Sequence, residues 1–60
     1  MTAMRVWRVV HRVGNHRRKQ YHDAHVMAQD AEEAAGVARY CLRLPKKAVL
    51  VSIQLMEERG

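Results

Sequence analysis

The segment from Val26 to Leu42 constrains the fold most, because it has the pattern of a strand end that passes directly into a helix. Asp30 is placed to act as the N-cap, and Glu33 completes a capping box of the form D-x-x-E. Acidic residues in a first turn also interact favourably with the positive end of the helix dipole. We therefore predict a helix that begins near Ala31.

The predicted helix has a narrow apolar face. At about 100° per residue its small and apolar side chains fall on one side, and most charged side chains point away. We expect this face to consist of Ala34, Val37, Ala38, Cys41 and Leu42. Because alanine lets a helix approach a sheet closely, we expect the rest of the chain to supply that sheet, with Cys41 buried against it.

Three further segments have the composition and alternation of strands, namely Met4–Val13, Gln20–Ala28 and Ala48–Glu57. Gly14-Asn15 supplies turn chemistry between the first two, because both residue types tolerate a positive φ. Leu44-Pro45 predicts the end of the helix, since the residue before proline avoids the α region. The element order is therefore ββαβ.

This order predicts a single α+β domain spanning residues 1–60. The helix returns toward the hairpin tip, and a right-handed crossover then places the third strand beside the first. The result is a mainly antiparallel three-stranded sheet in the order 2-1-3, with one helix packed on one face. We expect Val26, Val51 and Ile53 to lie beneath that helix.

The formal net charge of +5 is unevenly distributed along the chain. There is no acidic residue before Asp23, and a second basic group follows the middle of the helix. The predicted topology brings both groups to one end of the molecule, which predicts contact with nucleic-acid phosphates there. The candidate contact residues are Arg12, Arg17, Arg18, Lys19, Arg39, Arg43, Lys46 and Lys47.

The partner of this basic surface is DNA or RNA in the leading interpretation. The alternative is a protein-interaction module that acts on an acidic partner, such as a small inhibitor or adaptor of the phage or plasmid accessory type. Both interpretations assign binding and not catalysis.

A single helix covers only one face of the sheet, so we expect an apolar surface on the other. Its predicted residues are Trp7, Val9, Tyr21, Met27, Leu50 and Met56. This surface could bind a second copy, another protein, or stacked bases. Because aliphatic side chains outnumber aromatic ones, we favour a homodimer interface.

Other chemistry finds little support in the sequence. His11, His16, His22 and His25 do not have the spacing of a metal site, and no catalytic motif, cofactor site or small-molecule site is evident. One cysteine, Cys41, permits no internal disulfide and favours a reducing, cytoplasmic setting. The N-terminal segment lacks the apolar run of a signal peptide or a membrane span.

Overall fold

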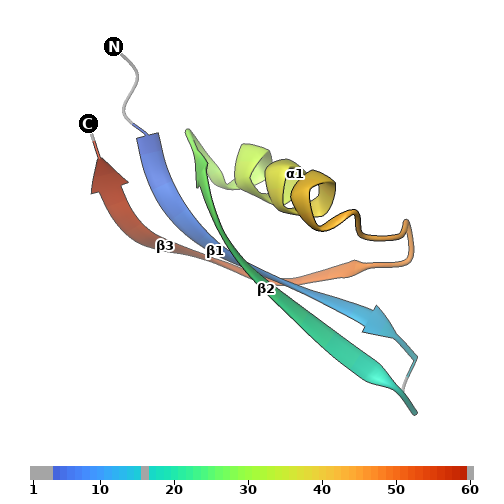
Figure 1. Ribbon diagram of the computed structural model, residues 1–60. Coiled ribbons are helices and arrows are strands. Elements are labelled where there is room, and N and C mark those ends of the chain that lie inside the picture. The colour runs from blue at the N-terminus through green and yellow to red at the C-terminus, as the bar shows by residue number, and fades with distance from the viewer. Residues whose placement is uncertain (1–3, 16, 60) are drawn as a thin grey trace.

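The computed structural model describes residues 4–15 and 17–59. Its elements are β1 (Met4–Gly14), β2 (Lys19–Ala28), α1 (Ala31–Leu42) and β3 (Val49–Arg59). The strands form one antiparallel sheet in the order β2-β1-β3, and α1 lies against one face of it (Figure 1). The predicted ββαβ architecture and strand order are confirmed.

The helix begins and ends through identifiable backbone contacts. The Asp30 carboxylate accepts a hydrogen bond of 2.8 Å from the backbone N–H of Glu33, as expected of an N-cap. At the other end Arg43 adopts the left-handed conformation, with φ 51° and ψ 47°. The backbone N–H groups of Arg43 and Leu44 donate to the carbonyl oxygens of Tyr40 and Arg39, which is a Schellman arrangement built without glycine.

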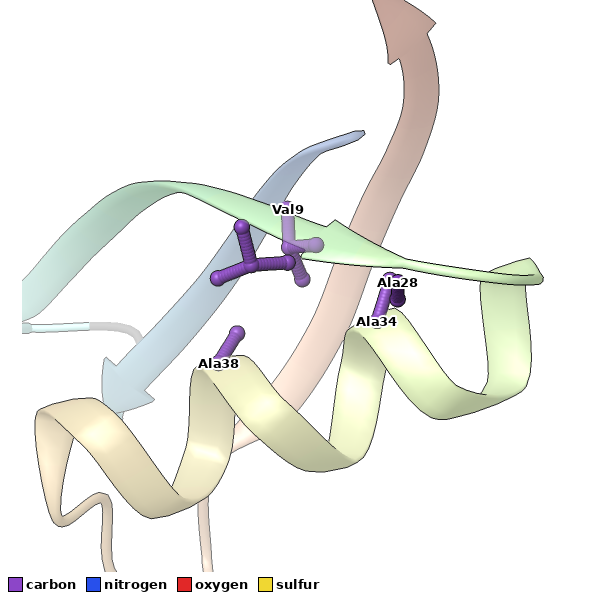
Figure 2. Packing of buried hydrophobic residues seen from close by; sticks show 5 residues of the cluster. Val9, Ala28, Ala34 and Ala38 are labelled. Carbon is purple, nitrogen blue, oxygen red and sulfur yellow. The ribbon is translucent and has the colours of Figure 1, made fainter. Parts of the chain in front are cut away.

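The core lies between the helix and the β1–β2 half of the sheet. Val9, Val26 and Ala28 from the strands meet Ala34 and Ala38 from the helix (Figure 2). Alanine on both sides lets the two layers approach closely, as the sequence predicted. A core of this size buries little apolar surface, which makes a small domain marginally stable on its own.

Trp7 and Val9 lie on the helix side of the sheet, so their expected place on the open face is wrong. Val9 is fully buried, and Trp7 packs against the core while its indole N–H donates to the carbonyl oxygen of Ala28 at 3.0 Å. Valines of both parities in β1 allowed either face to be the covered one. Packing of Trp7 and Val9 against the core shared with α1 selects the odd-numbered side chains of β1 as the covered ones.

Two register shifts in the β1–β3 pairing change which side chains of β3 face the helix. They lie between Val6 and Trp7 and between Val10 and His11, so β3 carries an extra residue at each. Ile53 packs on the core as predicted, whereas Val51 falls at a shift and is half exposed, contrary to our expectation. A strict period of two cannot anticipate such bulges.

Cys41 is exposed, which corrects the expectation that it is buried. Leu42, from the same predicted face, is exposed as well. Both residues lie in the last turn of α1, where β2 diverges from the helix because the sheet is twisted (Figure 1). The helix therefore buries its middle and leaves its end uncovered.

Candidate functional site

Two arginines on the sheet are neutralised by ion pairs. Arg5 contacts Glu58 at 2.9 Å, and Arg8 contacts Asp23 at 2.7 Å. The hydrogen bond from Arg8 lowers the pKa of the Asp23 carboxyl and raises that of the guanidinium. The positive charges of Arg5 and Arg8 are therefore balanced by carboxylates of the same chain.

Apart from Arg39, which bonds to carbonyl oxygens, seven other cations of the described residues have no acidic partner. Within residues 4–15 and 17–59 no ion pair involves Arg12, Arg17, Arg18, Lys19, Arg43, Lys46 or Lys47. All seven belong to the predicted site. We call this set the basic end.

The hairpin tip fixes the first four of these residues. Gly14 has a φ of +106°, which side chains with a Cβ rarely adopt, and the chain turns there. The Asn15 side-chain oxygen then accepts hydrogen bonds from the backbone N–H groups of Arg17 at 2.9 Å and Arg18 at 3.1 Å. The backbone of Arg17 and Arg18 is thus bonded to Asn15, while both arginine side chains are exposed.

Arg39 differs from the other predicted contact residues, because its side chain is bonded within the fold. Its guanidinium donates to the carbonyl oxygens of Ala48 at 3.0 Å, Pro45 at 3.1 Å and Lys46 at 3.2 Å. These bonds clamp the loop that joins α1 to β3. Helical periodicity placed Arg39 away from the core but could not show that the loop folds back over it.

The two basic groups lie at the same end of the molecule. Arg12 pairs with Val49, so the loop containing Lys46 and Lys47 joins the sheet at the level of Arg12. The β1–β2 hairpin projects beyond that level (Figure 1). The elongated shape, 45 Å by 17 Å by 13 Å, separates this end from the helix N-terminus and its acidic residues. The predicted charge polarity therefore has a structural basis.

Apolar exposure is concentrated differently from the predicted interface. Tyr21 and Met27 are exposed on the open face, where they pair with Arg12 and Val6. Leu50 is also exposed, although its pairing with His11 places it on the helix side. Met56 is exposed at a register shift in β3. Self-association itself stays a prediction.

His11 is the buried polar residue that sequence reasoning missed. Its side chain is 1% exposed, and its Nδ1 atom has no hydrogen-bond partner within the described part of the chain. Burial lowers its pKa, and the nearby charges of Arg39 and His22 add to the shift. The alternation of side chains along β1 could have indicated that His11 is buried. Because valines occur at both odd and even positions, alternation alone did not show which side of the strand is covered.

Across the described residues, no group of three or more potential ligands is arranged to hold a metal ion; His16 lies outside them. In the same residues no helix has the length and apolar character needed to cross a membrane. Comparisons with protein-family models, curated proteins and solved structures find no match to this chain. Within the described residues, the fold and charge together define a small ββαβ domain in which the seven cations of the basic end lack an acidic partner.

Proposed function

We propose that this protein binds nucleic acid through the phosphates, using the basic end as the contact surface. One observation carries the proposal: Arg5 and Arg8 are engaged by carboxylates, whereas the cations of the basic end have no such partner among the described residues. Cations that are not neutralised within the protein can pair with nucleic-acid phosphates, and this pairing releases the counterions condensed on the nucleic acid. The proposed role is binding, without a catalytic step or cofactor.

Arg39 is left out of the proposed contact surface, because its donors are used by loop carbonyls. We also propose a cytoplasmic setting. Cys41 is a lone, exposed thiol, and a reducing compartment would keep it from forming disulfides between molecules.

The test is fluorescence anisotropy of labelled DNA and RNA over a range of salt concentrations. The first variant replaces Arg17, Arg18 and Lys19 by alanine, and the second replaces Arg43, Lys46 and Lys47. Each lost phosphate contact should flatten the slope of log K against log salt by about 0.9 on duplex DNA, so each triple change should reduce it by roughly 2 to 3. Neither set lies in the core, so the melting temperature should change little.

Arg5→Gln is the matched control, because it removes one positive charge that is already paired with Glu58 at the opposite end. It should leave the salt slope nearly unchanged. Absence of binding by the wild-type protein at about 50 mM salt would defeat the proposal, since electrostatic affinity is strong there. Retention of an acidic protein from nuclease-treated lysate would then support the alternative partner class.

A further inference from the structure

The hairpin end contains a pocket lined by Arg12, Gly14, Asn15 and Lys19, with a volume of about 280 Å³. The parity of its lining residues on the strands places it on the face opposite α1. Val9 is buried under the helix, and successive side chains of a strand alternate, so Arg12 belongs to the other face. Lys19 is the pairing partner of Gly14 and shares that face. Two cations without acidic partners therefore line one recess.

An exposed aromatic ring lies beside this recess. Tyr21 pairs directly with Arg12 across the β1–β2 ladder, so both side chains project from the same face. The Tyr21 side chain is 59% exposed, and the helix lies on the opposite side of the sheet (Figure 1). The Arg8–Asp23 ion pair follows on the same face, farther from the tip. The ring surface is thus available beside the cationic recess.

This combination discriminates between forms of nucleic acid. Cations alone bind any phosphate backbone, whether it is a duplex or a single strand. A flat aromatic side chain gains stacking energy only from bases whose faces are accessible, which a duplex conceals and a single strand presents. Directly paired residues of an antiparallel ladder have Cα atoms about 5 Å apart, so one nucleotide can reach both side chains.

We infer that the open face at the hairpin end binds single-stranded nucleic acid, with a phosphate between Arg12 and Lys19 and a neighbouring base stacked on Tyr21. The inference rests on the proposed function and narrows it to one form of nucleic acid. It also gives the two basic groups different tasks. The hairpin contacts the phosphate and base, while the loop after α1 adds general electrostatic attraction.

The experiment measures anisotropy of a labelled oligothymidylate of about ten nucleotides and of a duplex of equal length. Tyr21→Ala should weaken single-strand binding by roughly five-fold to a hundred-fold, the range expected for one lost base stack. Tyr21→Leu should lose the same contact while keeping an apolar side chain on the strand. Tyr21→Phe should retain binding, because the ring and not the hydroxyl makes the contact.

Tyr40→Ala provides the matched control, since Tyr40 is 83% exposed but lies on α1, on the other side of the sheet. It should bind as the wild type does. The Tyr21 variants should also keep the wild-type salt slope, whereas Arg12→Gln should reduce it by about 0.7 on the single strand. Far-ultraviolet circular dichroism and Trp7 fluorescence verify folding.

The possible results distinguish failure of base stacking on Tyr21 from failure of nucleic-acid binding as a whole. If both Tyr21→Ala and Tyr21→Leu are folded and bind the single strand like the wild type, while the Arg12 variant is weakened, stacking on Tyr21 is overturned and phosphate binding stands. Equal affinity for duplex and single strand would also overturn the inference. If the wild-type protein binds neither probe, the proposed function fails and the inference fails with it.

Discussion

The guanidinium of Arg39 donates a hydrogen bond of 3.0 Å to the carbonyl oxygen of Ala48, which ties the last turn of α1 to the residue before β3. Two further bonds from the same group, to Pro45 and Lys46, satisfy carbonyls that the loop would otherwise leave to water. A basic residue near a helix C-terminus also interacts favourably with the helix dipole. The loop conformation that carries Lys46 thus depends on this one side chain.

Arg39→Lys should lower the free energy of unfolding by about 1–3 kcal/mol, because a lysine ammonium cannot reproduce the planar fork that reaches three carbonyls. In a domain of this size each 1 kcal/mol corresponds to a shift of roughly 4–8 °C in melting temperature. Lys47→Ala, at an exposed position, is the control and should melt like the wild type. Equal melting of the Arg39 variant would show that the clamp contributes nothing to stability.

Replacement by alanine should have opposite effects on stability at the two described glycines, Gly14 and Gly36. A Cβ at Gly36, in the middle of α1, would have nothing within 4 Å, so Gly36→Ala should stabilise the protein by about 0.5–1 kcal/mol. A Cβ at Gly14 would clash with the carbonyl oxygen of Arg18, and the φ of +106° is unfavourable for alanine. Gly14→Ala should therefore destabilise the hairpin. Chemical denaturation of both variants checks the signs.

Stability should fall as the solution is acidified below the ordinary pKa of histidine. The pKa of His11 is lowered in the folded protein, so between about pH 6.5 and that lower value the unfolded chain binds more protons than the folded one. The free energy of unfolding therefore decreases as pH falls through this window. Asp23 has a lowered carboxyl pKa as well, but its contribution is lost only below the ordinary Asp range.

His11→Leu should flatten this pH dependence, because it removes the buried titrating group together with its unpartnered Nδ1 atom. Urea unfolding at intervals between about pH 5 and 7 measures the effect. Gln54→Ala changes an exposed residue that does not titrate and should keep the wild-type pH dependence. A His11→Leu protein whose stability still falls over the same interval would assign the titration to another group.

Self-association is expected to involve β3. The exposed large apolar residues on this strand are Val49, Leu50, Val51, Leu55 and Met56, and β3 forms an edge of the sheet. An apolar edge strand favours pairing with another chain, and a second copy would supplement a core made largely of alanine. Sedimentation at micromolar concentration should therefore give about twice the monomer mass.

Leu50→Glu and Leu55→Glu should each shift the protein toward monomer and lower its stability, because a charge would be placed in the shared surface. Tyr40→Glu introduces the same charge on α1 and should leave the assembly intact. A monodisperse wild-type monomer at high concentration would contradict the prediction.

Local sequence signals predicted the elements and their order well. These signals are the Asp30 cap, the turn at Gly14 and the end of the helix before Pro45. Each depends on a few neighbouring residues, so it can be identified from the sequence alone. The side-chain environments were harder. Which parity of β1 faces the helix depends on tertiary packing, and the bulges near Val51 and Met56 depend on pairing with β1.

The location of the basic end was predictable, because topology alone places the hairpin tip and the loop after α1 at the same end of the molecule. The distinct role of Arg39 was not, since it follows from three carbonyls that meet only in the folded loop. The pairing of Tyr21 with Arg12 likewise requires the register of the β1–β2 ladder. Composition could suggest that the partner is negatively charged. It could not show the arrangement of side chains that would distinguish a single strand from a duplex.

The projection of the hairpin past the rest of the sheet has a consequence for its motions. The last pair between β1 and β3 is Arg12–Val49, whereas the pairing of β1 with β2 continues through Val13–Gln20 to Gly14–Lys19. These outer pairs lack a third strand, so they should open locally at a lower free energy than the segment around Val9. Their amide protons should exchange with deuterium early, and a bound oligonucleotide should slow that exchange at the tip more than in the core.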